Sequence, residues 1–481
     1  MGSPYKYVNK MKFEKGSIKR VLALQMDAWL TLLQTGIYAF GWFYSYYPLL
    51  RLPRFSQAGL YLGEGLKLFF NGHVLVIAIY LFLLILFSRM YKGGNGSGYL
   101  RPLNMFFSQL FAILIVNLVT YVQLSLMRGW IVAVRPMLFI AGGQLILTLL
   151  WSYLSDRVYT AVFPIRKLLL ISGAYPTDEI ISKFMSRADR YEITKSVGTE
   201  EGRQEVKQTD LSDYGGVVLW DIPASVRNDL LKTCYAKGVR VYVMPKISDV
   251  LLKGAVQMHL FDTPILMVQD YAMSFGQRFI KRVIDLVCAV VLIVITSPIM
   301  LVTVFIIKAY DRGPVLYKQI RCTANMKEFC MIKFRSMCVD AEKDGVARLA
   351  GKNDDRITPF GHFIRACRID ELPQLFNVIK GDMSFIGPRP ERPDIIRQYL
   401  EVMPEFAFRT RVKAGLAGYA QIYGKYNTTP YDKLKLDLTY IENYSVWLDL
   451  KLMLLTLKIL FTPDSTEGVD DKQITALKDQ K

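Results

Sequence analysis

The chain has 481 residues, enough for two or three domains. Apolar residues make up 52% of it, a high share for a water-soluble protein, and they gather in long runs near the N-terminus and once in mid-chain. The formal net charge is +18, which suits a protein that meets nucleic acid, anionic lipid headgroups or phosphorylated substrates. The six cysteines follow no disulfide or zinc-site spacing, so we expect them to be reduced and cytosolic.

Four apolar segments follow a basic N-terminal leader, and we predict that each crosses a membrane. They cover residues 21–50, 74–87, 105–127 and 136–154. A helix rises about 1.5 Å per residue and the bilayer core is about 30 Å thick, so each segment is long enough, the second only with its flanks. Four buried core helices are the alternative, which the lack of a polar face on these segments disfavours. The leader is too basic and too long to resemble a cleaved signal peptide.

Lysine and arginine residues in the short connections indicate how these segments are oriented. The leader, from Lys6 to Arg20, is strongly basic, and so is the connection at residues 89–101. Both are therefore predicted to lie on the cytoplasmic side. The loop at 51–67 also carries basic residues, which reduces the difference in positive charge between the two sides. An even number of crossings over residues 1–157 then places the rest of the chain in the cytosol.

Residues 158–272 predict a small α/β module with a parallel sheet. The apolar runs and helical segments that alternate there are 167–172, 178–187, 216–220, 226–237, 239–243 and 265–268. Alternation of this kind is typical of strand–helix–strand units. The first turn, at residues 172–176, lacks the G-x-G-x-x-G pattern that lets a backbone approach a pyrophosphate. A degenerate, Rossmann-like module with a structural or regulatory role is therefore favoured over a dinucleotide site.

We predict that residues 279–307 form a helix that enters and leaves the membrane on one face. Both ends are basic, with Lys281 and Arg282 at one and Lys308 at the other, so both prefer the cytoplasmic side. Ser297-Pro298 falls midway and removes a backbone donor, which breaks or kinks a helix into arms too short to cross alone. A fifth spanning helix is the alternative.

With this helix, residues 273–461 are predicted to form one basic, α-rich domain. Its last segment, 446–461, is apolar but carries Asp449, Lys451 and Lys458, which suits either a helix lying in the membrane interface or an ordinary core helix. Residues 462–481 are polar and are predicted to be a disordered tail.

The paired acids Asp370 and Glu371 are the candidate catalytic centre. Neighbouring positions on a helix point about 100° apart, so one carboxylate can face a phosphorus atom while the other holds a cation. Magnesium needs few protein carboxylates when phosphate oxygens and water complete its ligands. A carboxylate can also attack phosphorus and form an acyl phosphate, provided that nearby positive charge stabilises the transferring group.

Candidate phosphate-binding cations lie on both sides of this pair. Arginine binds phosphate through a bidentate fork, whereas lysine acts as a point charge. The candidates are Lys333, Arg335, Arg365, Arg368 and Arg389. Arg389 is flanked by Pro388 and Pro390, which restrict the backbone and so hold the base of its side chain in place.

These motifs, in this order, resemble those of bacterial sugar transferases, the monotopic phosphoglycosyl transferases also called polyprenyl-phosphate hexose-1-phosphate transferases. The shared motifs are Lys281-Arg282 with Asp285, Ser297-Pro298, Gln319-Ile320-Arg321, Lys333-Phe334-Arg335-Ser336-Met337, Arg356-Ile357-Thr358, Gly361 with Arg365, Asp370-Glu371-Leu372-Pro373-Gln374, Asn377, Gly381-Asp382-Met383-Ser384, Gly387-Pro388-Arg389-Pro390, and Gly415 to Gln421. The whole layout is similar to the large form of the family, with four membrane helices, a degenerate Rossmann-like module and a catalytic domain.

The resemblance implies a two-step reaction at the inner face of the bacterial plasma membrane. Asp370 would attack the sugar-bearing phosphorus of a UDP-sugar and release UMP, and undecaprenyl phosphate would then take the phosphosugar. Glu371 would hold Mg²⁺. It also implies phosphate contacts from Lys333, Arg365 and Arg389, and a homodimer; no nucleic acid takes part.

Further roles follow from the same resemblance. Lys281 and Arg282 would lie near headgroups or the lipid phosphate, Ser297-Pro298 would break the re-entrant helix, and Gln421 would belong to the substrate site. Two positions depart from the family pattern: Cys322 replaces a glycine, and Ala414 replaces a proline.

The implied pathway is the start of a capsule, exopolysaccharide or O-antigen repeat. Glucose and galactose are favoured over N-acetylated sugars. The alternatives are an ordinary membrane glycosyltransferase, which would release UDP, and a non-catalytic membrane scaffold that regulates polysaccharide assembly.

Overall fold

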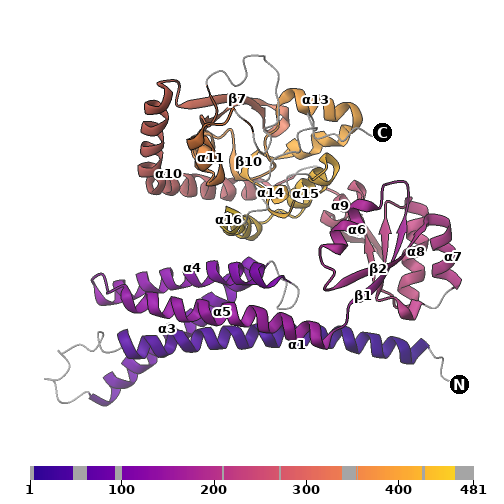
Figure 1. The fold of residues 1–481 in the computed structure, drawn as a ribbon, viewed down its shortest axis with the longest axis horizontal. Helices are drawn as coiled ribbons and strands as arrows, with labels where there is room; N and C mark the ends of the chain where they lie inside the picture. The colour runs from indigo at the N-terminus through magenta and orange to yellow at the C-terminus, as the bar shows by residue number, and fades with distance from the viewer. Residues whose placement is uncertain are drawn as a thin grey trace. The chain divides into compact units, whose positions relative to one another are not determined.

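A computed structural model describes residues 5–46, 62–92, 100–208, 211–269, 272–338, 354, 356–424 and 428–460. The chain divides into two compact units, Met1–Met244 and Pro245–Lys481 (Figure 1). The sequence predicted the boundary near residue 272. The structure differs because helix α9 (Ile247–Gly254) places Val250 in the hydrophobic core of the second unit. The predicted tail, 462–481, lies outside the described residues.

The first unit begins with long helices that pack side by side. They are α1 (Tyr5–Gly41) with the short π-helix η1 (Trp42–Tyr46), α3 (Leu62–Lys92), α4 (Pro102–Arg128) and α5 (Arg135–Val162). Their shared core is rich in aromatic side chains, and Tyr38, Trp42 and Tyr80 are fully buried in it. The helices are longer than the predicted apolar segments because their polar flanks are helical too. Helix α4 ends at Gly129, which has a left-handed conformation, and α5 ends at Phe163, which is extended.

Four helices of the described chain are long and apolar enough to span a membrane. They are His73–Lys92, Pro102–Met127, Arg135–Val162 and Phe275–Tyr310. The first predicted segment, 21–50, is not among them, because α1 carries polar residues on its packed face. Asp27 forms an ion pair of 2.6 Å with Lys92, and Gln34 Nε2 donates to Thr148 Oγ1 at 2.9 Å. The structure is thus consistent with a membrane protein.

The α/β module contains a four-stranded parallel sheet in the order β2-β1-β3-β4. The elements are β1 (Arg166–Ser172), α6 (Asp178–Met185), β2 (Tyr191–Gly198), α7 (Thr199–Gln208), β3 (Gly216–Trp220), α8 (Ala224–Ala236) and β4 (Val241–Val243). Side chains on β1 and β3 alternate: Leu170 packs with α6 on one face, and Leu169 packs with α7 and α8 on the other (Figure 1).

Most of the module confirms the predicted strands and helices. The sequence missed β2 because its residues alternate between polar and apolar rather than forming an apolar run. The predicted strand 265–268 does not join this sheet. It belongs to an exposed antiparallel hairpin of β5 (Val256–Leu260) and β6 (Thr263–Met267) in the second unit.

The backbones packed closely at the carboxyl ends of β1 and β3 lie where ligands bind in open parallel sheets. Gly173 N–H donates to Trp220 O at 2.9 Å, and a Cβ on Gly173 would lie 1.9 Å from Asp221 O. Trp220 Nε1 also donates to Pro176 O at 3.2 Å. Whether the module holds a nucleotide there stays a prediction.

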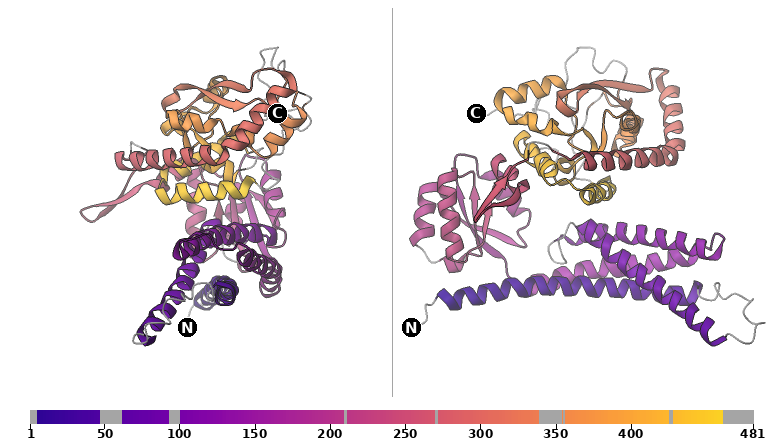
Figure 2. Two further views of the ribbon diagram at one scale, coloured as in Figure 1. Left: turned by 90° about the vertical axis from the view of Figure 1, so that its left-hand side faces the viewer. Right: turned by 180° about the vertical axis from the view of Figure 1, so that it is seen from behind.

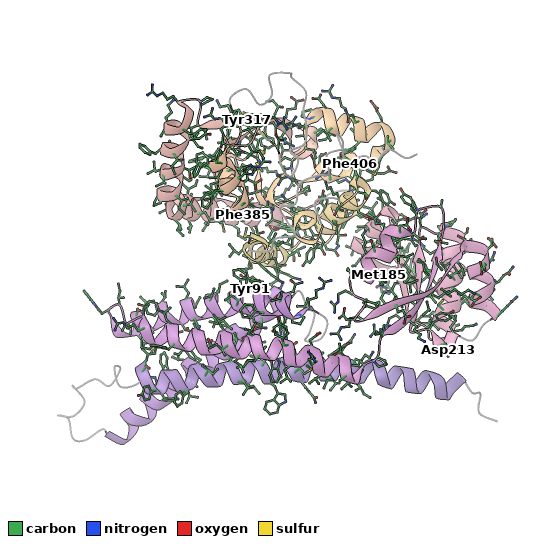
Figure 3. All side chains as sticks on the ribbon, viewed as in Figure 1. Tyr91, Met185, Asp213, Tyr317, Phe385 and Phe406 are labelled. Carbon is green, nitrogen blue, oxygen red and sulfur yellow. The ribbon has the colours of Figure 1, made fainter. Side chains whose placement is uncertain are left out.

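The second unit combines short sheets with helices. Its strands, besides β5 and β6, are β7 (Leu316–Cys322) with β8 (Glu328–Phe334), and β9 (Ser384–Ile386) with β10 (Gly415–Ala417). Its helices, besides α9, are α10 (Phe275–Asp311), α11 (Pro359–Ala366), α12 (Gln374–Lys380), α13 (Pro393–Val402), α14 (Tyr419–Tyr423), α15 (Pro430–Glu442) and α16 (Val446–Leu460). Phe385, labelled in Figure 3, packs against both the main core and the smaller core beside α10.

Helix α10 is bent into two arms, and Figure 2 shows the sharp turn between them. Pro298 lies inside the helix and cannot donate to the carbonyl of Val294. Ser297 Oγ donates to that carbonyl instead, at 2.8 Å. Many apolar side chains around the bend are exposed, Val294 and Leu301 among them.

The start of α10 is fixed to the second unit by three charged residues. Lys281 is buried and forms an ion pair of 2.6 Å with Asp449 on α16. Arg282 donates to the carbonyls of Val378 and Ile379 at 2.6 and 2.7 Å, which neutralises the C-terminal end of α12.

The third residue, Asp285, accepts the N–H of Phe385 at 2.9 Å. The ends of both arms contact the same unit, since Ile307 packs with Phe334 and Ile364. These contacts occupy Lys281 and Arg282 with protein groups, so their role at headgroups stays a prediction.

The Lys281–Asp449 pair leads to a stability prediction. Asp449→Ala leaves the buried ammonium without its partner and lowers the free energy of unfolding by about 3–5 kcal/mol. The double variant Lys281→Met with Asp449→Leu recovers most of the loss, because neither charge is then buried. Denaturant unfolding of the detergent-solubilised protein measures both. Asp394→Ala is the control, since that ion pair with Arg397 is exposed and should matter little. Equal losses in the single and double variants would contradict this account.

Candidate active site

The paired acids Asp370 and Glu371 lie in a short 3-10 turn, η5 (Ile369–Glu371), between α11 and α12. Arg368, just before it, has φ 53°, a left-handed conformation that a non-glycine residue seldom adopts. This reversal follows the end of α11 and turns the chain so that Asp370 is buried, with 9% of its surface exposed. Pro373 then caps the start of α12.

Three positive side chains surround the carboxylate of Glu371. Lys333 Nζ is 3.2 Å from Glu371 Oε1, and Arg389 Nη2 is 3.3 Å from the same oxygen. Arg368 Nη1 is 3.7 Å from Glu371 Oε2. Among the described residues, these ion pairs reach Glu371 but none reaches Asp370. One acid of the pair is therefore neutralised by cations, while the other has no ion pair with any residue that the structure describes.

The environment separates the two acids further. Burial and the neighbouring charge of Glu371 raise the pKa of the Asp370 carboxyl to about 6, although nearby cations oppose the rise. Burial would also raise the pKa of the Glu371 carboxyl, but Lys333 and the arginines outweigh it and hold this pKa well below its usual range. Such a split between adjacent acids is typical of functional sites.

The position of Lys333 is set by β8 and by an asparagine on α12. Asn377 Nδ2 donates to Cys330 O at 2.8 Å, and its Oδ1 accepts from the N–H of Ile332 at 3.2 Å. One amide therefore fixes the helix that follows the acid pair against the strand that carries Lys333. Burial lowers the pKa of the Lys333 ammonium, and the acids beside it oppose that change.

The structure brings together most of the predicted site. Glu371, Lys333, Arg368 and Arg389 are in contact, and the charge of Arg365, at the end of α11, also acts on Asp370.

Two predicted residues lie elsewhere in the unit. The guanidinium of Arg335 packs against Gly313, where a Cβ would be 2.3 Å from Arg335 Nη1. Gln421 on α14 lies beside Gly418, whose backbone packs against the carbonyl of Gly387. Their roles in substrate binding stay predictions.

The resemblance implies a magnesium ion at the acid pair. Asp370 and Glu371 are hard oxygen ligands, but no group of three or more potential metal ligands forms among the described residues. Magnesium is commonly held by one or two carboxylates together with substrate phosphates. The residues present therefore fit an ion held by Glu371 and a bound diphosphate, and they do not form a closed protein site.

Sequence reasoning missed the residues that support the site. Asn377 and Arg321 belong to the motifs shared with the family, but no role was predicted for them. Arg409 and Asp437 belong to none of these motifs. Their partners are distant in the chain, and no local pattern identifies them.

Comparisons with known proteins identify a family and several relatives of this chain. The family model described as bacterial sugar transferase matches residues 276–463. A UDP-N-acetylgalactosamine-undecaprenyl-phosphate N-acetylgalactosaminephosphotransferase of Aeromonas hydrophila is 36% identical over 269 residues, 54% of this chain and 63% of the relative. An undecaprenyl-phosphate glucose phosphotransferase of Komagataeibacter xylinus is 38% identical over 226 residues, 45% of this chain and 42% of the relative.

A third relative is matched over most of its length. It is a UDP-glucose:undecaprenyl-phosphate glucose-1-phosphate transferase of Caulobacter vibrioides, 38% identical over 190 residues, which are 38% of this chain and 71% of the relative. The match spans less than two thirds of the first two relatives.

The fold and site define a protein with long apolar helices and an acid pair ringed by cations. The chain belongs to the bacterial sugar transferase family.

The electrostatics of the acid pair can be tested without substrate. In the metal-free protein, the Asp370 carboxyl should be neutral below pH 6 and ionised above it. Infrared difference spectra between the wild type and Asp370→Asn identify its band. Lys333→Met removes a charge that lowers this pKa, so the midpoint should move to higher pH. A midpoint near the ordinary value of about 3.9, or a downward shift in Lys333→Met, would contradict the assignment.

Proposed function

We propose that this chain is a phosphoglycosyl transferase that moves a sugar 1-phosphate from a UDP-sugar to undecaprenyl phosphate. The observation that carries the proposal is the asymmetry of the acid pair. Glu371 is held by three cations, whereas no described residue is ion-paired with the buried Asp370 carboxylate beside it. A free carboxylate next to concentrated positive charge suits nucleophilic attack on a phosphorus atom. The family and the names of its relatives support the same reaction class.

The reaction has two displacements at one phosphorus atom. A carboxylate oxygen of Asp370 attacks the sugar-bearing phosphorus, and the bond from this phosphorus to the bridging oxygen breaks, so UMP leaves with that oxygen. An oxygen of undecaprenyl phosphate then attacks the same phosphorus. The bond to Asp370 breaks, which restores the carboxylate and gives undecaprenyl-diphospho-sugar. No oxidant or net proton is required.

The cations around Glu371 provide charge for both steps. Lys333, Arg368 and Arg389 lie within 4 Å of that carboxylate, at 3.2 to 3.7 Å, and are therefore beside the adjacent Asp370. They stabilise the negative charge on the transferring phosphoryl group and the leaving UMP. A magnesium ion, when bound at Glu371, would neutralise charge on the diphosphate.

We also propose that α10 is a re-entrant membrane helix on the cytoplasmic face of the bacterial inner membrane. The bend at Pro298 and the exposed apolar side chains of both arms support this, as do the contacts of both ends with one folded unit. One substrate dissolves in water and the other stays in the bilayer, so a site at this boundary reaches both. The basic chain attracts both anionic substrates.

The reaction would be the first step of exopolysaccharide, capsule or O-antigen synthesis. The relatives carry glucose or N-acetylgalactosamine in their names, so the family alone does not select the sugar. A non-catalytic membrane scaffold is the second candidate. It is disfavoured because the acid pair retains all three of its cations.

The nucleophile assignment predicts that Asp370→Asn abolishes UMP release. We expect a loss on the order of 10³-fold or more, since removal of a nucleophile acts on the whole reaction. Wild-type protein is incubated with undecaprenyl phosphate, Mg²⁺ and a panel of UDP-sugars, and UMP is measured. Mass spectrometry of a peptide that contains Asp370 should show a phosphosugar adduct in the wild type.

Asp394→Asn, at an exposed ion pair, is the matched control and should keep full activity. Release of UDP instead of UMP would indicate an ordinary glycosyltransferase. Full turnover in Asp370→Asn with saturating UDP-sugar would refute the nucleophile, and a wild type inactive with every UDP-sugar would favour the scaffold.

The re-entrant helix predicts where single cysteines can be labelled. Arg278→Cys and Ala309→Cys lie at opposite ends of α10, and Val294→Cys lies at the bend. In a background without the exposed Cys338 and Cys367, a membrane-impermeant maleimide should label both ends from the cytoplasmic side of oriented vesicles and spare position 294. Labelling of the two ends from opposite sides would show a spanning helix.

A further inference from the structure

The loop that carries Arg389 is held through its carbonyl groups. Four successive carbonyls accept hydrogen bonds from other parts of the second unit, and the donors come from segments far from the loop. The four hydrogen bonds run from Gly415 N–H to Pro388 O at 2.9 Å, from Arg409 Nη2 to Arg389 O at 3.0 Å, from Arg321 Nη1 to Pro390 O at 3.1 Å, and from Cys322 N–H to Glu391 O at 3.0 Å. Prolines at 388 and 390 have no N–H, so these carbonyls are the main means of fixing the backbone there.

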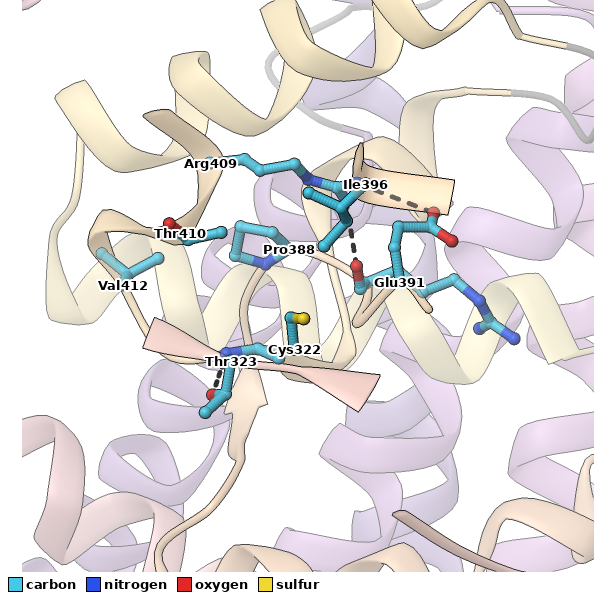
Figure 4. A pocket seen from close by; sticks show the side chains of 10 residues that line it. Cys322, Thr323, Pro388, Glu391, Ile396, Arg409, Thr410 and Val412 are labelled. Atoms are coloured by element: carbon cyan, nitrogen blue, oxygen red, sulfur yellow. Dashed lines mark hydrogen bonds and ion pairs between the residues drawn. The ribbon is translucent and has the colours of Figure 1, made fainter. Parts of the chain in front are cut away.

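The donor to Arg389 itself is a buried arginine. Arg409 lies in the 3-10 segment η6 (Pro404–Arg411), and only 4% of its side chain is exposed. Its Nη2 is 2.9 Å from Asp437 Oδ2, and its Nη1 is 3.6 Å from Glu391 Oε1. In Figure 4, dashed lines mark the ion pair of this guanidinium with the Glu391 carboxylate and its hydrogen bond to the loop. The Nη2 group that lies beside Asp437 is also the one that donates to Arg389 O, so the two carboxylates fix the direction of this donor.

A second arginine holds the other side of the same acid. Arg321 Nη1 is 3.8 Å from Glu391 Oε2 and donates to Pro390 O. Gln319 Oε1 accepts from Arg321 Nε at 2.9 Å, which fixes that guanidinium in turn. Glu391 therefore joins two arginines, each of which holds one carbonyl of the loop.

Arg389 is contacted separately at its backbone and at its side chain. The guanidinium of Arg389 reaches Glu371 at 3.3 Å, while its carbonyl is held by Arg409 at 3.0 Å. Arg409 is bonded to the backbone of Arg389, and its own side chain is committed to Asp437 and Glu391. Its effect on the acid pair therefore passes through Arg389.

We propose that Arg409 is a positioning residue that sets the place of the Arg389 guanidinium at the acid pair, with Asp437 and Glu391 fixing Arg409 in turn. The inference rests on the proposed function for what Arg389 does to substrate. The position of Arg389 itself does not depend on that function.

The test uses Arg409→Lys in the full-length protein. Lysine keeps the charge but lacks the fork that reaches a carbonyl and two carboxylates together. We expect kcat for UMP release to fall by about 10- to 100-fold, because a misplacement of a catalytic group by roughly 1 Å has an effect of this size. KM for the UDP-sugar should change less. Arg411→Lys is the matched control, because Arg411 is an exposed residue of the same segment, stacked on Phe408, and should keep wild-type turnover.

A double-mutant cycle separates positioning from general damage. If Arg409 acts through Arg389, then adding Arg409→Lys to Arg389→Ala should cause little further loss. A merely structural effect would lower activity by the same factor in both backgrounds, and that result would overturn the proposal. So would unchanged kcat in Arg409→Lys.

An activity-independent measurement covers the case in which the proposed function fails. Hydrogen exchange at the N–H groups of Cys322 and Gly415, which donate to the loop carbonyls of Glu391 and Pro388, should become faster in Arg409→Lys and stay unchanged in Arg411→Lys. If Arg409→Lys does not fold, Asp437→Asn, which loosens Arg409 without removing it, should show the same local increase. Wild-type exchange across this loop in a folded variant would refute the inference even if the protein proved to be no transferase.

Discussion

The site depends on the placement of three positive charges around one carboxylate. Two adjacent acids in a buried turn repel each other, and at least one must be neutralised for the turn to exist. Lys333, Arg368 and Arg389 neutralise Glu371, and no described residue is ion-paired with Asp370. These cations come from a strand, a left-handed residue and a proline-bounded loop, so three separate parts of the second unit must be correctly placed at once.

Local motifs made the centre of this site predictable. Asp370-Glu371 and the proline-flanked Arg389 are short patterns whose chemistry is contained in a few neighbouring residues. The bend at Ser297-Pro298 could be predicted for the same reason, because the lost hydrogen bond follows from the proline alone. Strands β1 and β3 were also visible, since strands buried on both faces form continuous apolar runs.

The supporting contacts could not be predicted because they join distant parts of the chain. Lys281 and Asp449 are 168 residues apart, and no single-sequence pattern relates them. Lys281 therefore looked like an exposed basic residue at a membrane helix, whereas the structure buries it. The run at 265–268 was misplaced for a similar reason: an apolar run predicts a buried strand, but these residues form an exposed hairpin. Asn377 and Arg409 act through backbone groups, which the sequence does not reveal.

The hydroxyl of Ser297 has a consequence for how a helix can be broken inside a lipid layer. Each unsatisfied peptide group costs several kcal/mol in hydrocarbon, where no solvent can replace the missing donor. The Ser297 hydroxyl donates to the carbonyl of Val294 in place of the missing proline N–H, so in the re-entrant placement proposed above α10 would turn among acyl chains without a bound water molecule. In that placement, the length of the two arms would limit the depth of the turn, and the nearest source of hydration would not.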